Sequence, residues 1–215
     1  MRYNLAKSYS GGFLMKTEII DVFSGKDGRE KALELTERTA AYCGLGKKES
    51  LHLRLLSEEI VELIRPFTGM FPGDFWLETN DKNIEIHLKT EIPMDQQTKK
   101  ELLSVSTSGK NSAAKGLIGR IREMIATVTL PSDPETKMLT DEAMSLMSMG
   151  SPMGTYYSGA YSWSMKTYAA SVNANSSDKE EAKDELEKSI VANIADEVSV
   201  NIVDSTVEVV IFKAV

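Results

Sequence analysis

The chain has few of the residues that form cross-links and metal sites. Of its 215 residues, one is a cysteine, Cys43, and two are histidines, His52 and His87. A single cysteine excludes an intramolecular disulfide and fits a reducing compartment, so we expect a cytoplasmic protein. Neither histidine has another histidine or a cysteine close by in the sequence, whereas zinc sites use clustered ligands at set spacings. We therefore expect no metal site.

Long hydrophobic runs and an excess of positive charge are also missing. No apolar run approaches the roughly 18 residues of a membrane span, and residues 1–14 lack the continuous apolar segment of a signal peptide. The formal net charge is −7, from 25 Lys and Arg against 32 Asp and Glu. An acidic chain has no overall field that attracts nucleic acid. We expect neither a membrane nor a nucleic acid as partner.

What the sequence does contain is a clear order of helix and strand patterns. Apolar residues at helical spacing predict four helices, over residues 28–43, 49–65, 116–128 and 178–194. Alternating or β-branched runs predict five strands, over residues 13–23, 75–79, 84–92, 198–202 and 207–213. Strands grouped in hairpins with helices elsewhere predict an α+β fold. We expect a two-layer α/β sandwich, with the helices packed on one face of a mixed, mostly antiparallel sheet.

The domain organisation follows from the same pattern. Residues 1–14 form an N-terminal extension, and residues 15–215 form a single domain. The polar stretch 93–115 has the composition of a mobile lid and includes a short helix over 95–105. A Met- and Tyr-rich insertion spans residues 131–177, in which we expect helices near 139–148 and 160–172.

The Met- and Tyr-rich insertion can be interpreted in two ways. Its methionines and aromatic residues, with few charges among them, are typical of a surface that binds a protein partner or a second copy of the chain. The same side chains would also suit an extension of the core. We place the expected surface within residues 138–168, which include Tyr157 and Trp163.

Two stretches carry candidate chemistry. On the helix 49–65, Glu58 and Glu62 point away from the apolar face, whereas Glu59 lies at its rim, where a carboxylate could orient a water or a metal. The alternative is that the three glutamates are the solvated face of the helix. In residues 108–122, a glycine-containing loop runs into a helix, and this junction offers backbone N–H groups for a phosphate. The residues concerned are Lys110, Lys115, Gly116 and Gly119. The alternative is an ordinary flexible connection, and the Walker pattern is absent.

Four segments together resemble the GHKL superfamily of ATP-binding domains, in particular the branch similar to anti-sigma-factor kinases. LRLLSEEIVELI (53–64) is similar to the signature helix in which a Glu-Glu pair precedes a metal-binding Asn by four residues. IEIHLKTEIPMD (84–95) stands where the family has a strand and an Asp-x-Gly-x-Gly adenine-binding turn. AAKGLIGRIREMI (113–125) is similar to the end of the lid and the helix after it, and residues 185–213 resemble the closing helix and strand pair.

The resemblance implies an ATP site. At two positions of this site the chain differs from the family pattern. It makes Glu59 the general base, Glu91 or Asp95 the adenine anchor, and Lys110, Lys115, Gly116 and Gly119 the phosphate-binding residues, with Mg²⁺ required only if ATP binds. The position of the metal-binding Asn holds Leu63, which has no ligand atom, and the glycine turn is lost.

Three functional hypotheses follow. The first is a divergent regulatory protein of the GHKL type that does not hydrolyse ATP and acts through protein partners. The second is an active ATP-dependent serine protein kinase or ATPase that uses Glu59. The third is an interaction module that does not use nucleotides.

Overall fold

The structure is a computed structural model that describes residues 4–5, 15–22, 27–64, 72–80, 83–92, 117–128, 155–157, 160–174, 179–203 and 205–215. The described strands are β1 (Asn4–Leu5), β2 (Met15–Lys16), β3 (Ile20–Asp21), β4 (Gly73–Asn80), β5 (Asn83–Glu91), β6 (Thr155–Tyr157), β7 (Ala160–Ser164), β8 (Glu197–Val203) and β9 (Thr206–Ala214). The described helices are α1 (Gly28–Tyr42), α2 (Lys47–Ile64), α4 (Leu117–Val128), α6 (Met165–Ala174), α7 (Lys179–Lys188) and α8 (Ile190–Ile194). The expected helices over 95–105 and 139–148, and the expected lid, lie outside the described residues.

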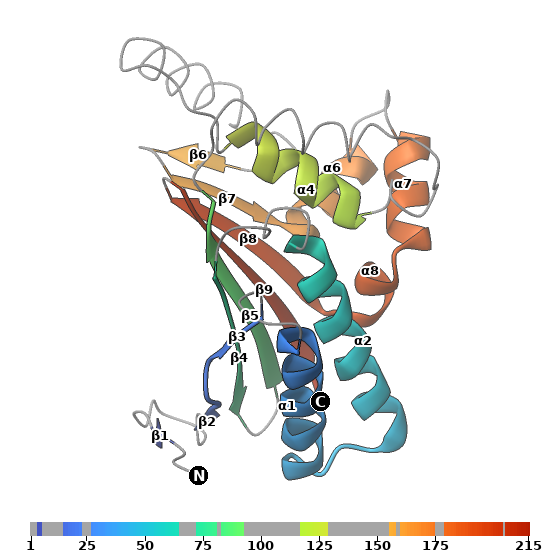
Figure 1. Cartoon of the computed structure of the whole chain (residues 1–215). Coiled ribbons are helices and arrows are strands. Elements are labelled where there is room, and N and C mark those ends of the chain that lie inside the picture. The colour runs from blue at the N-terminus through green and yellow to red at the C-terminus, as the bar shows by residue number, and fades with distance from the viewer. Residues whose placement is uncertain are drawn as a thin grey trace.

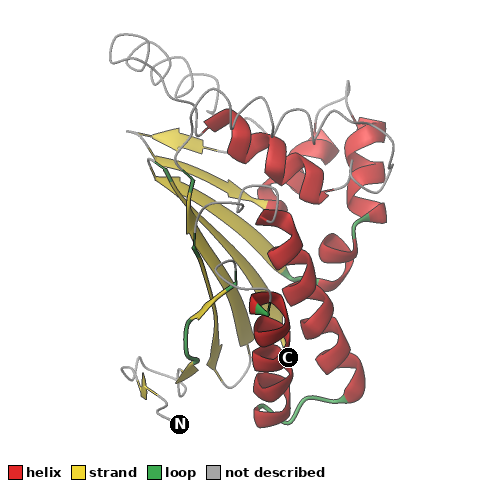
Figure 2. Cartoon of the chain, viewed as in Figure 1, coloured by secondary structure: helices red, strands yellow, loops and turns green. Residues whose placement is uncertain are grey.

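The strands form one sheet in the order β1-β2-β4-β5-β9-β8-β7-β6, with β3 paired to β4 beside β2. Every strand pair that the structure describes is antiparallel. The described helices lie on one face of this sheet (Figures 1 and 2). The predicted two-layer α+β sandwich is therefore confirmed, and in the described part the sheet is wholly antiparallel rather than mixed.

The core lies between the helices and the inward face of the sheet. Along β5, β8 and β9 the inward residues are β-branched or aliphatic and at most 1% exposed: Ile84, Ile86, Leu88, Val198, Val200, Ile202, Val207, Val209 and Ile211. Their neighbours in sequence are polar, aromatic or half-exposed and point to the opposite face. This period of two gives the sheet one apolar and one mixed face.

Helix α2 crosses the centre of the inner face. Leu53, Leu56 and Ile60 recur at helical spacing and are fully buried, and the helix packs on β5 and β9. The predicted contact of this helix with the sheet is confirmed for these three residues. None of the described helices has both the length and the hydropathy that a membrane crossing demands.

Helix α1 is fixed at both ends and packs against α2. At its start, a Cβ on Gly28 would lie 2.6 Å from the carbonyl oxygen of Val22, so only glycine fits there. Beyond its end, Gly44 has a φ of 67°, the left-handed conformation that stops a helix. Between the two helices, the buried Thr36 hydroxyl lies 2.9 Å from Ser57 Oγ and forms a hydrogen bond.

Two predicted elements differ from the structure. The helix expected over 178–194 is divided into α7 and α8 by Ser189, which has an extended backbone (ψ 121°) and whose hydroxyl accepts a hydrogen bond from the N–H of Ala192. A side-chain N-cap of this kind starts a new helix. The helix expected over 160–172 begins only at Met165, since residues 160–164 form β7.

The N-terminal extension and the insertion both contribute to the sheet. Asn4 and Leu5 pair with Lys16 and Met15, so these two residues of the expected extension belong to the domain. The described part of the insertion adds β6 and β7 beyond β8. Tyr161 and Trp163 alternate with small residues along β7 and are 4% and 3% exposed.

Candidate functional site

The predicted catalytic carboxylate lies on the last turns of α2, among two other glutamates. Glu58 forms an ion pair with Arg29 of α1, and Glu62 Oε1 lies 3.3 Å from Arg29 Nε. Glu59 is half-buried beside them. Arg29 thus holds Glu58 and Glu62 against α1, and all three glutamates are half-buried.

The surroundings of Glu59 favour its protonated form. Burial raises the pKa of Glu59, the carboxylates of Glu58 and Glu62 raise it further, and Arg122 offsets part of the effect. Arg122 comes from α4 and donates hydrogen bonds to the carbonyls of Leu63 (2.9 Å) and Glu62 (2.7 Å). These carbonyls belong to the last turn of α2 that the structure describes, and side chains commonly satisfy the final carbonyls of a helix. Arg122 thus caps α2 and joins it to α4.

The residue four positions after Glu59 does not fit a magnesium ion. Leu63 is 1% exposed and belongs to the hydrophobic core. Magnesium requires oxygen ligands in octahedral geometry, and an aliphatic side chain has none. The Mg²⁺ that the GHKL resemblance implies therefore lacks its expected ligand on α2.

The remaining predicted nucleotide residues are divided between several places. Gly119 lies in the first turn of α4, one turn before Arg122, so it belongs to the helix that packs on α2. Glu91 is exposed at the end of β5, and it alternates with Thr90 and Ile92, which are buried on the inner face. Glu91 thus faces away from the helices, and it does not share a site with Glu59. Asp95, Lys110, Lys115 and Gly116 lie outside the described residues.

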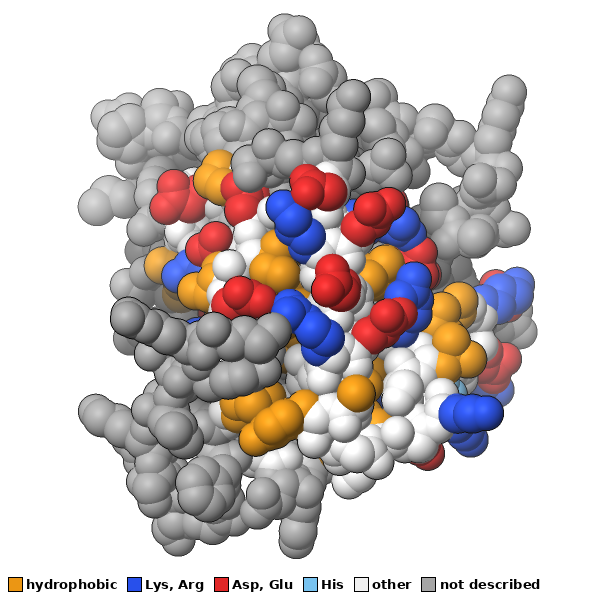
Figure 3. Space-filling model, turned by 60° about the horizontal axis from the view of Figure 1, so that its bottom comes forward, with side chains coloured by type: hydrophobic (Ala, Val, Ile, Leu, Met, Phe, Trp, Pro, Cys, Tyr) orange, Lys and Arg blue, Asp and Glu red, His pale blue; other side chains and the backbone are white. Residues whose placement is uncertain are grey.

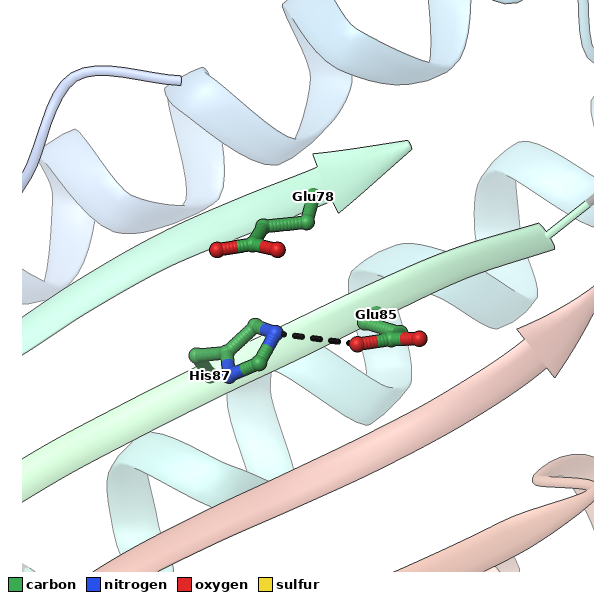
Figure 4. A group of neighbouring side chains, drawn as sticks. All are labelled: Glu78, Glu85 and His87. Atoms are coloured by element: carbon green, nitrogen blue, oxygen red, sulfur yellow. Dashed lines mark ion pairs between the residues drawn. The ribbon is translucent and has the colours of Figure 1, made fainter. Parts of the chain in front are cut away.

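Sequence reasoning missed a second group of side chains, on the outer face of the sheet. Glu78 of β4 stands opposite Glu85 of β5, and Trp76 stands opposite His87. One ligand atom from each of Glu78, Glu85 and His87 lies within 4.8 Å of the others. Figure 4 shows the imidazole beside both carboxylates, with Glu78 on one strand and the other two residues on its neighbour.

We expected no metal site because the histidines have no ligands near them in the sequence. Spacing along the sequence does not show which residues are neighbours on adjacent strands. The signal that could have found the group was present in the sequence. Asn80 pairs with Asn83 across the hairpin, and this register sets Glu78 against Glu85. His87 then follows Glu85 by two residues on the same face.

The surface expected within residues 138–168 is only partly described. Tyr161, Trp163, Met165 and Tyr168 are all buried within the core. Trp163 and Tyr168 lie 5.9 Å apart between ring centroids, and Arg120 lies over the Tyr168 ring at 5.0 Å. For these four residues the interpretation as an extension of the core is therefore correct, and the interpretation as a surface that binds a partner is wrong. The five methionines from Met138 to Met153 lie outside the described residues.

Charges on the described helices are mixed in sign. Arg54 pairs with Glu37, and Arg38 Nη2 lies 2.9 Å from Glu18 Oε1. On the face seen in Figure 3, basic and acidic side chains are interspersed rather than separated. A face of this kind does not produce the positive field that phosphate backbones require.

Comparisons with known proteins identify no relative. No family model, no curated protein and no solved structure matches this chain.

Proposed function

We propose that the chain is a cytoplasmic regulatory protein on a GHKL-like scaffold, which acts by binding a protein partner or a second copy of itself and does not turn over ATP. The observation that carries this proposal is Leu63, because the position that should bind the magnesium ion is part of the core. Phosphoryl transfer depends on a metal ion to neutralise the charge that develops on the phosphates. A scaffold that lacks this metal ligand can still act by binding a protein partner or a second copy of itself.

The order of elements supports the choice of scaffold. An N-terminal strand, the α1–α2 pair, the β4–β5 hairpin, α4 and the β8–β9 pair follow one another as in the segments that resemble the family. Arg122 joins α4 to α2, the helix that resembles the family's signature helix.

A second candidate, the active kinase or ATPase, is favoured by one observation. The pKa of Glu59 is raised by burial and by its acidic neighbours, and a raised carboxyl pKa suits a general base that works near neutral pH. This candidate requires metal ligands other than Leu63.

ATP turnover separates the two candidates. We expect purified protein with ATP and Mg²⁺ to release no phosphate above the background of a Glu59→Gln variant. Glu58→Gln, one residue away on the same helix, is the matched control. Turnover that Glu59→Gln abolishes and Glu58→Gln retains would establish the enzyme and refute our proposal.

Nucleotide binding is tested separately, by thermal unfolding with and without ATP. A ligand that binds only the folded state at 100 times its Kd stabilises it by about 2.7 kcal/mol. Lys115→Ala should reduce any such shift, whereas Lys89→Ala, which removes an exposed lysine of β5, should not. The absence of any shift would favour the third hypothesis, an interaction module that does not use nucleotides.

A further inference from the structure

We infer that the outer face of the β4–β5 hairpin binds a divalent cation of the zinc class, held by Glu78, Glu85 and His87. This site is independent of the proposed function, because it lies on the face of the sheet opposite to α2 and Glu59.

Strand pairing brings the three side chains together. Glu78 and Glu85 are partners across the hairpin, and His87 follows Glu85 on the same face of β5. His87 Nε2 lies 3.3 Å from Glu85 Oε2, and the three ligand atoms lie within 4.8 Å of one another. Ligands about 2.0–2.2 Å from a tetrahedral zinc ion lie roughly 3.3 Å apart, so small side-chain rotations of the two glutamates would close the site.

His87 is buried without hydrogen bonds. The residue is 8% exposed, and within the described part of the chain neither Nδ1 nor Nε2 has a hydrogen-bond partner. A buried polar atom without a partner destabilises the folded state. A cation bound between the imidazole and the two carboxylates would give an imidazole nitrogen a partner.

Trp76 orients two of the three ligands. Its indole ring stacks on the imidazole, with centroids 4.7 Å apart and planes 9° from parallel. The indole N–H donates a 2.9 Å hydrogen bond to Glu78 Oε1. Side chains that orient the ligands of a metal in this way contribute strongly to its affinity.

The charged side chains around His87 have an excess of negative charge, which favours a bound cation. Glu78, Glu85 and Glu208 surround it, with Glu208 Oε1 at 3.6 Å from Nδ1. Against these carboxylates stands Lys16, 3.2 Å from Glu78 Oε1 and over the Trp76 ring. Further along the same face Asp74 and Lys89 are register partners, so they add no net charge. Like charges directly opposite one another destabilise a sheet, and a divalent cation between Glu78 and Glu85 would remove this repulsion.

Both carboxylates of the site are accessible to an ion from solution. The side chains of Glu78 and Glu85 are 22% and 39% exposed, so solvent reaches the carboxylates.

The chemistry of the ligands selects the ion. Two carboxylates and one imidazole suit Zn²⁺ and its borderline neighbours, whereas Ca²⁺ and Mg²⁺ prefer oxygen ligands alone. The competing explanation is that His87 pairs directly with Glu85 and Glu208, without any metal.

Zinc titration by calorimetry tests the inference. The parent for the test is tag-free protein carrying Cys43→Ser and His52→Gln, which leaves His87 as the only histidine and removes the only thiol. We expect one Zn²⁺ per chain, with Glu85→Gln and His87→Gln each weakening the binding at least about tenfold. Glu91→Gln removes the same charge from the same face of β5 and should change the Kd less than about twofold.

Three outcomes would overturn the inference. They are the absence of saturable Zn²⁺ binding, binding that Glu91→Gln weakens as much as Glu85→Gln does, and binding that His87→Gln leaves unchanged. Far-UV circular dichroism of each variant confirms folding. Because the Glu85 side chain is 39% exposed, Glu85→Gln keeps the test valid even if His87→Gln fails to fold.

Discussion

At the scale of single residues, Glu59 and Leu63 stand one turn apart on α2 in contrasting environments. Leu63 is buried in the core, and Glu59 is half-buried at its edge. The sequence placed both residues correctly, because helical spacing alone determines which side of α2 they occupy. The sequence does not show the effect of the environment on the pKa of Glu59, because burial, the largest cause, depends on tertiary packing, and Arg122, which opposes it, is far away in the chain.

The raised pKa of Glu59 predicts a pH dependence of stability. A carboxyl that binds its proton more tightly in the folded state contributes most to stability below the ordinary Glu pKa, about 4.3. That contribution is lost as the pH rises through the raised value. Because Glu59→Gln removes the titration, we expect the variant to gain stability relative to the unmodified chain between about pH 4 and about pH 7.

Urea unfolding at both pH values measures this gain. Glu49→Gln is the control, because it removes an exposed carboxylate at the other end of the same helix. We expect no such gain from it. A Glu59→Gln variant whose relative stability is the same at both pH values would contradict the prediction.

At the scale of elements, the accuracy of the sequence predictions depended on how local the determining contacts are. Helix α2 and the β4–β5 hairpin were predicted because their own residues carry a clear period. The helix predicted from residue 160 is wrong over strand β7, because Tyr161 and Trp163 alternate over too few residues to indicate a strand until β8 is placed beside them. The Glu78, Glu85 and His87 group depends on which residues of β4 and β5 stand opposite one another, so a prediction of the hairpin alone does not reveal it.

The packing of α2 predicts a contrast between two positions on the same helix. Ile60 is fully buried, and Leu51 is 55% exposed. Ile60→Ala should lower the free energy of unfolding by about 2–5 kcal/mol, because it leaves a cavity in the core. Leu51→Ala should change it by no more than about 0.5 kcal/mol. Chemical denaturation of both variants checks the prediction, and equal losses would show that α2 does not pack as described.

At the scale of the whole molecule, one sheet extends from the N-terminal strands to the described part of the insertion. β7 joins the sheet through β8, and the buried Trp163 connects it to Tyr168 of α6. The described part of the insertion therefore shares the core of the domain. Its stability should be inseparable from that of the rest.

This continuity predicts the effect of removing Trp163. Trp163→Ala should cost about 3–5 kcal/mol and should leave the apparent size in solution unchanged, because the side chain is buried. Fluorescence, which then reports Trp76, and far-UV circular dichroism should give coincident unfolding transitions. A lost association with unchanged stability would show instead that Trp163 belongs to an interface.

The place of β9 in the sheet has a consequence for how the chain acquires its structure during synthesis. β9 is the last described strand along the chain, yet it lies between β5 and β8, and its residue Thr206 pairs with Glu91, more than a hundred residues earlier. While the ribosome is still making the intervening residues, the β4–β5 hairpin has an open edge where β9 will later bind. An open edge of this kind can pair with other chains, and contacts between residues so far apart in sequence form slowly. The period between the synthesis of β5 and that of β9 is therefore when a growing chain has most need of a chaperone.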